Sequence, residues 1–137
     1  PQLWEKSYQN GLYQQLYKHR GELGMLGVSL NYNYQQDELT YLLAIEKPAG
    51  EVEFDFDLEV RDIPAHTWAV FTGVGPLPKA IDDLWQRIYS QWFAATGYKT
   101  AREPKMEVFY HDLAHYYYNG EDNSGYEFEI WIPIVDD

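Results

Sequence analysis

The sequence predicts an α+β fold in which one strand-helix-strand-strand unit occurs twice. Leu3–Tyr8 (LWEKSY) recurs 81 residues later as Leu84–Tyr89 (LWQRIY), and the two copies share Leu, Trp and Tyr. Apolar residues follow helical spacing around both copies, and two strand-like runs come after each of them. Because 137 residues can bury a core without disulfides or bound metal ions, we expect one domain over residues 1–137, with halves of about 1–50 and 51–137.

The second half contains the clearer of two amphipathic helices. Its apolar residues recur at i, i+3, i+4, i+7 and i+11, which are positions Ile81, Leu84, Trp85, Ile88 and Trp92. Pro78 is suited to a first helical turn, and Gly97 is suited to a C-terminal end. The pattern predicts a helix over about 78–96.

The first half repeats this helix less clearly. Aromatic and aliphatic residues step by four from Trp4 to Leu16, and Gly21 follows the basic His19 and Arg20 at the C-terminal end. This spacing predicts a helix over about 3–20. The repeat also requires a strand before this helix, but Pro1 leaves no room for it, so we expect the N-terminal strand to be missing from this sequence.

The strand-like runs complete the two units. An alternating run, Val52–Val60, places its apolar residues on one face of an extended segment. Runs rich in β-branched and aromatic residues lie after each helix and before the second one. The predicted strands are residues 25–31, 39–46, 66–73, 105–110 and 126–134.

Composition excludes several classes of function. The chain has no cysteine, so disulfides, thiolate metal sites and a cysteine nucleophile are excluded. The net charge of −12 repels nucleic acid, and no apolar run has the length of a membrane span. We therefore expect a cytoplasmic protein without cofactor or metal, which binds neither nucleic acid nor membrane directly.

Glu107 is the most informative single residue, because it is an acid inside an apolar and aromatic strand. Burial removes its hydration, and a cationic ligand would compensate for that loss. Under strand alternation Phe109 shares its face. The alternative is a structural role, in which Glu107 is exposed at an edge or paired with Lys105 or Arg102.

Other candidate site residues are aromatic or lie at symmetry-related positions. Trp85 and Tyr89 lie on or beside the apolar face of the second helix, where core packing is the alternative role, and Trp68 is a candidate pocket wall. The repeat places Gly27 at the position equivalent to Glu107, so we expect Gly27 to leave room for the body of a ligand. Tyr116–Tyr118 are candidates for a flap over the site.

Four segments together resemble the GyrI-like small-molecule-binding domain, the effector module of many AraC-type and MerR-type multidrug transcription regulators. They are Ile63–Phe71, Ile81–Trp92, Pro104–Tyr110 and Glu129–Ile134, in the order and spacing of that family. The resemblance implies a curved antiparallel sheet that carries two helices, with a ligand cleft along a pseudo-two-fold axis. It also implies that Glu107 contacts hydrophobic cations and that Tyr126 contributes a ring.

The expected function is therefore the binding of hydrophobic, aromatic or cationic small molecules as a ligand-sensing module of transcription regulation or drug resistance. The expected ligand-binding residues are Glu107, Phe109, Tyr126, Trp68, Trp85, Tyr89 and Gly27, and no catalytic residue is assigned. Two alternatives stay open: a hydrolase of reactive cyclopropane-type compounds that uses the same glutamate, and a gyrase-inhibitor-like protein-interaction module. Further expected partners are a second copy of the chain and an attached DNA-binding domain.

Overall fold

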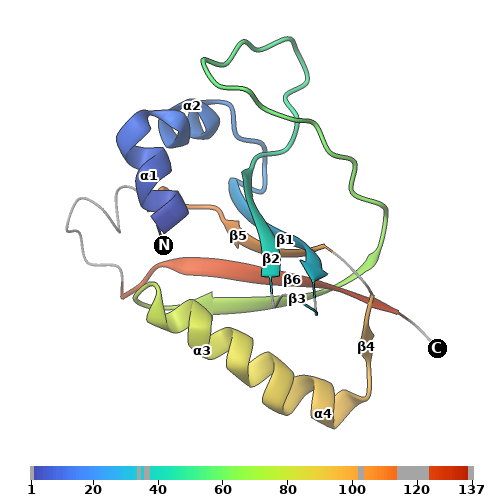
Figure 1. The fold of residues 1–137 in the computed structure, drawn as a ribbon. Coiled ribbons are helices and arrows are strands. Elements are labelled where there is room, and N and C mark those ends of the chain that lie inside the picture. Colours follow the sequence, from blue (N-terminus) through green and yellow to red (C-terminus); the bar gives the residue numbers. More distant parts are fainter. Residues whose placement is uncertain (1, 34, 36–37, 102–103, 114–123, 136–137) are drawn as a thin grey trace.

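The computed structural model describes residues 2–33, 35, 38–101, 104–113 and 124–135 (Figure 1). Its helical elements are α1 (Gln2–Asn10), α2 (Leu12–Lys18), α3 (Lys79–Arg87), the π-helical turn η1 (Ile88–Trp92) and α4 (Phe93–Thr96). Its strands are β1 (Met25–Asn33), β2 (Glu38–Ala44), β3 (Thr67–Val74), β4 (Lys99–Thr100), β5 (Lys105–Phe109) and β6 (Glu127–Val135). Helices and antiparallel strands in one chain confirm the predicted α+β class.

The strands form one curved, open sheet in the order β2-β1-β5-β6-β3, and the short β4 pairs with the end of β6. All described pairings are antiparallel. The central pair, β1 and β5, joins the two segments that the sequence repeat makes equivalent. Their register places Gly27 directly opposite Glu107.

The predicted helix over 78–96 is confirmed. The elements α3, η1 and α4 follow one another from Lys79 to Thr96, and Gly97, with φ of +76°, ends the run. This left-handed conformation costs glycine little, which is why glycine commonly terminates helices. The helix lies along the sheet on the side of β3 and β6 (Figure 1).

The predicted continuous helix over 3–20 is wrong at its centre, because Gly11 divides it into α1 and α2. Gly11 has φ of +91°, a left-handed conformation that interrupts a right-handed helix. The Asn10 Oδ1 accepts a hydrogen bond from the Leu12 N–H at 3.0 Å, which satisfies a free donor at the start of α2. Both helices still bury aromatic side chains, Trp4 from α1 and Tyr13 from α2.

The five predicted strands are confirmed, with ends that differ by one or two residues. The two-residue β4 was not predicted, since it is too short to show a periodic pattern. Val52–Val60 forms no strand. Its burial alternates only as far as Asp57, and Leu58 and Val60 are exposed.

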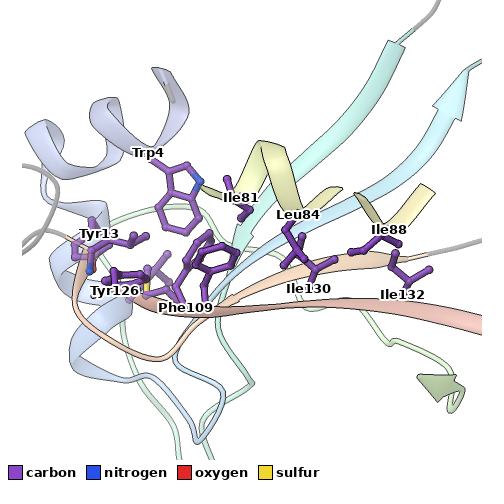
Figure 2. Packing of buried hydrophobic residues seen from close by; sticks show 13 residues of the cluster. Trp4, Tyr13, Ile81, Leu84, Ile88, Phe109, Tyr126, Ile130 and Ile132 are labelled. Atoms are coloured by element: carbon purple, nitrogen blue, oxygen red, sulfur yellow. The ribbon is translucent and has the colours of Figure 1, made fainter. Parts of the chain in front are cut away.

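The sheet separates two apolar clusters. We call the side that carries the helices the helix face; here side chains from α1, α2, α3 and η1 pack on β5 and β6 (Figure 2). The other side, the outer face, holds a smaller cluster. Buried residues of the helix face include Trp4, Tyr13, Leu84, Ile88, Phe109, Tyr126, Phe128, Ile130 and Ile132; those of the outer face are Leu26, Val28, Met106 and Val108.

Candidate functional site

Glu107 lies in the middle of β5, between β1 and β6. Because side chains alternate along a strand, Glu107 and Phe109 point to the helix face, whereas Met106 and Val108 pack on the outer face. The prediction that Glu107 and Phe109 share a face is confirmed. Phe109 is 4% exposed, and its ring meets the Trp4 indole edge-on with centroids 5.4 Å apart.

Two ring donors hold the Glu107 carboxylate. Trp85, on α3, donates its indole N–H to Oε2 at 2.7 Å, and Tyr41, on β2, donates its hydroxyl to Oε1 at 2.8 Å. The Tyr41 hydroxyl in turn accepts a hydrogen bond from the Trp4 Nε1 at 3.0 Å. The residues Trp4, Tyr41, Trp85 and Glu107, which we call the Glu107 site, therefore connect both halves of the chain.

Gly27 explains how Tyr41 reaches across β1 to Glu107. A Cβ at Gly27 would lie 1.9 Å from the Tyr41 hydroxyl oxygen, so any side chain here would displace that hydroxyl. The repeat predicts that Gly27 leaves room for a ligand. In this structure the Tyr41 hydroxyl occupies that space.

Burial dominates the electrostatics of the Glu107 site. It raises the pKa of Glu107, the hydrogen bonds from Trp85 and Tyr41 oppose that rise, and the negative charge of Asp82 adds to it. Burial and the Glu107 charge also raise the pKa of Tyr41. Tyr41 therefore remains a hydrogen-bond donor at neutral pH.

No basic side chain in the described part of the chain neutralises Glu107. The ion pairs found there are exposed, and they join Arg61 to Glu59 and Lys79 to Asp83. The alternative of a structural pair with Lys105 is therefore not seen, and Arg102 lies outside the described residues. Within the described ranges, the hydrogen bonds to the carboxylate come from the neutral donors Trp85 and Tyr41.

Stacked rings lead from Glu107 to the surface. Trp85 stacks on Tyr89 with centroids 6.0 Å apart, and Tyr89 stacks on Phe93 at 5.5 Å. Tyr89 is 44% exposed, and the Lys105 ammonium lies 5.1 Å from the centroid of its ring. We call Trp85, Tyr89 and Phe93 the ring ladder.

Two expected pocket residues lie elsewhere. Trp68 is on the outer face, where its indole packs against Trp131 with centroids 5.7 Å apart, so it does not face Glu107. Tyr126 is 1% exposed within the core, and its hydroxyl donates to the His111 carbonyl at 2.6 Å. Tyr116–Tyr118 lie outside the described residues.

Trp4 and Tyr41 are members of the Glu107 site that are absent from the expected ligand-binding residues. The sequence repeat contains a signal for Trp4, because it aligns Trp4 with Trp85. Both indole N–H groups belong to one hydrogen-bond network around the carboxylate. No comparable signal marks Tyr41, whose contact with Glu107 depends on the order of the strands.

The described residues contain no group of three His, Asp or Glu side chains that could hold a metal ion. Within the same ranges, no helix has both the length and the apolar composition needed to cross a membrane.

The fold and the comparisons with known proteins define the class of protein, a GyrI-like effector-binding domain. Residues 1–134 match the Cass2 family, described as integron-associated effector binding proteins. The chain belongs to this family. Comparison with curated protein sequences finds no match.

Two solved structures share the fold at low sequence identity. One is a Staphylococcus aureus MU50 protein, assigned provisionally to bacterial transcription regulation, with a TM-score of 0.74 and 19% identity over 98% of this chain and 78% of the other. The second is SAV2435 bound to tetraphenylphosphonium, with a TM-score of 0.72 and 19% identity over 97% of this chain and 75% of that one.

Proposed function

We propose that this chain is an effector-binding module that takes hydrophobic organic cations, with Glu107 as their counter-charge. The observation that carries the proposal is the half-buried carboxylate of Glu107, which is surrounded by rings and has no basic partner among the described residues. Membership of an effector-binding family supports it, as does the tetraphenylphosphonium bound to SAV2435. In a longer regulator, occupancy would be passed to an attached DNA-binding domain.

The chemistry of the site favours a bulky, delocalised cation. Both carboxylate oxygens already accept hydrogen bonds, from Tyr41 and Trp85, so the site offers charge and ring faces more than free hydrogen-bond acceptors. A phosphonium or a quaternary ammonium ion has no N–H donor, so a negative charge and ring faces are sufficient to bind it. The two donors also help to keep Glu107 ionised against the effect of burial.

The ring ladder supplies the apolar surface for such a cation. Tyr89 is its exposed member, and Lys105 already places an ammonium group over that ring. A ligand that approaches the same ring face competes with this intramolecular cation. We therefore infer that Lys105 lowers the affinity of the site for external cations.

Lys105→Gln is accordingly expected to raise the affinity for tetraphenylphosphonium. An exposed cation–π contact contributes about 0.5–1 kcal/mol, so the gain should be about two- to fivefold. Isothermal titration calorimetry measures it, and Lys47→Gln, which removes the same charge from an exposed loop, is the control. An equal gain in both variants would mean that net charge, not the Tyr89 contact, is responsible.

The affinity for a permanent cation should fall as the pH is lowered through the raised pKa of Glu107, at a higher pH than an exposed glutamate would require. The folded-state pKa of Glu107 is raised, so the carboxylate is lost by protonation as the pH falls through that value, and binding weakens by at most tenfold per pH unit. The stability of the ligand-free protein changes with pH in the opposite direction to the affinity. The contribution of Glu107 to stability is present at low pH and is lost as the pH rises through its folded-state pKa. A Glu107→Gln variant should lack the Glu107 contribution to the pH dependence of affinity and to the pH dependence of stability.

A charge-reversed isostere tests the proposal most directly. Tetraphenylphosphonium and tetraphenylborate have similar size and shape, so the difference in their affinities measures the demand for positive charge. Saturable binding of the cation alone supports the module, and equal binding of both ions contradicts it. Turnover of a bound electrophile that depends on Glu107 would favour the hydrolase instead, and binding of neither ion would favour a protein-interaction module.

A further inference from the structure

The outer face of the sheet carries a second carboxylate among rings. Glu129, on β6, is the neighbour of Val108 on β5, whereas Glu107 is opposite Ile130. The two acids therefore occupy adjacent positions of the sheet but point to opposite faces. In the described ranges the outer-face cluster consists of strand residues and of Leu23 and Tyr110 from the adjoining loops, and no helix contributes to it.

The Glu129 carboxylate is held on one oxygen only. Its Oε1 accepts hydrogen bonds from the Trp131 Nε1 at 2.9 Å and from the Tyr110 hydroxyl at 2.5 Å. No described residue donates a hydrogen bond to Oε2 or forms an ion pair with Glu129. Among the described residues, one oxygen is therefore fixed in position and the other accepts no hydrogen bond.

The Trp131 indole, which donates to Glu129, belongs to a larger aromatic surface on the outer face. The Trp68 and Trp131 indoles are tilted by 57° with centroids 5.7 Å apart, so they form an open corner rather than a closed stack. The His66 ring meets Trp68 edge-on at 5.3 Å, and its Nε2 is buried with no hydrogen-bond partner among the described residues. All three rings are half-buried.

The local charge also favours a cation. Burial, the hydrogen bond to Glu129, and the charges of Glu129 and Glu46 raise the pKa of Tyr110 to about 12. Two negative groups therefore act on one phenol. Where the chain is described, no Lys or Arg forms an ion pair with either acid.

We propose that Glu129, Trp131, Trp68 and Tyr110 form a second cation-binding site, the outer corner, which takes compact alkylammonium ions free in solution. Two tilted indole faces and one anchored carboxylate match the recognition of quaternary ammonium by aromatic rings. Because the Trp68 and Trp131 rings are only half-buried, the ligands of the outer corner should be small. Their dissociation constant should be on the order of 1 mM. The outer corner does not depend on the function proposed for Glu107.

The test uses indole N–H signals in ¹H–¹⁵N spectra, since the chain has five tryptophans and they report on different faces. The signal that disappears in Trp131→Phe and the one that disappears in Trp68→Phe identify the indole N–H groups of these two residues. Tetramethylammonium chloride is titrated against sodium chloride at equal ionic strength, in a Glu107→Gln background. Saturable shifts of the Trp131 and Trp68 signals are expected, with the Trp4 and Trp85 signals unmoved.

Three variants decide whether the outer corner itself binds. Glu129→Gln keeps an acceptor for Trp131 and Tyr110 but removes the charge, and it should weaken binding at least tenfold. Glu127→Gln, an exposed acid two residues earlier on the same strand, should leave binding unchanged. Trp68→Leu, which leaves the hydrogen bonds of Glu129 intact, should weaken it severalfold and serves if Glu129→Gln fails to fold.

Three results would overturn the outer corner. They are shifts that sodium chloride reproduces, shifts that persist at full affinity in Glu129→Gln, and shifts confined to Trp4 and Trp85. Because Glu107 is already neutralised, failure here leaves the proposed function untouched. Failure of tetraphenylphosphonium to bind the wild type would likewise leave the outer corner intact.

Discussion

Glu107→Gln is expected to weaken tetraphenylphosphonium binding by about 30-fold to several thousand-fold. Truncating one partner of a buried charge pair costs about 2–5 kcal/mol, and each 1.4 kcal/mol is a factor of ten in affinity. The ring contacts contribute less, at about 0.5–2 kcal/mol each, so the rings tune an affinity that the charge establishes. The variant should stay folded, because glutamine keeps a carbonyl oxygen as acceptor and removes a charge that burial disfavours.

Calorimetric titration of wild type and variant measures this loss. Glu127→Gln is the matched control, since it removes one negative charge from an exposed position on β6 and should leave the affinity within about twofold of wild type. A Trp85→Phe variant separates the two roles of that residue, because it keeps a ring but removes the donor to Oε2. If Glu107→Gln bound the cation as well as wild type, Glu107 would not be the counter-charge.

The second helix was predictable because its signals are local and agree with one another. Ile81, Leu84 and Ile88 repeat at helical spacing, and Gly97 ends the run in the structure as in the prediction. The break at Gly11 was not predicted, because the four-residue step from Trp4 to Leu16 continues across it. Periodicity reports which residues face the core, and two helices that meet at a left-handed glycine can share one periodicity.

The sequence predicts the candidate site only through Glu107, because an acid is unusual in an apolar and aromatic strand. Glu107 stands out in its own strand, and strand alternation then places Phe109 correctly beside it. Tyr41 is 66 positions from Glu107, so their contact requires the order β2-β1-β5 and a glycine in the strand between them. Trp68 was misplaced for a similar reason, since β3 carries apolar residues on both faces and its sequence does not say which face the helices cover.

The hydrogen-bond network around Glu107 contains the tryptophan of both copies of the repeated sequence motif. Trp4 and Trp85 occupy equivalent positions of the two copies, yet only Trp85 reaches the carboxylate directly, while Trp4 acts through Tyr41. The asymmetry follows from the pairing of Glu107 with Gly27, since one half supplies the charge and the other supplies the space for a donor. A symmetric pair of acids at these two positions would repel each other in a poorly solvated site.

Phe128→Ala should be the most destabilising single truncation on the helix face of β6. Phe128 is fully buried, and its ring lies against the backbone of Gly73 on the paired strand β3. Removing a buried phenyl ring leaves a cavity and costs about 3–5 kcal/mol, which is a large share of the stability of a small domain. Urea unfolding should show a lower midpoint with an unchanged m-value, and Phe128→Leu should show a smaller loss if the alanine variant does not fold.

Gly73→Ala provides the complementary test. A Cβ at Gly73 would lie 2.4 Å from the Phe128 Cζ, so in the wild type this substitution should cost about 1–3 kcal/mol by overpacking. In the Phe128→Ala background the same methyl group enters vacated space, so its cost should disappear and the double mutant should be more stable than the sum of the single changes predicts. Strict additivity would show that the Phe128 ring does not pack on Gly73 in solution, and that the close pairing of β3 with β6 has another cause.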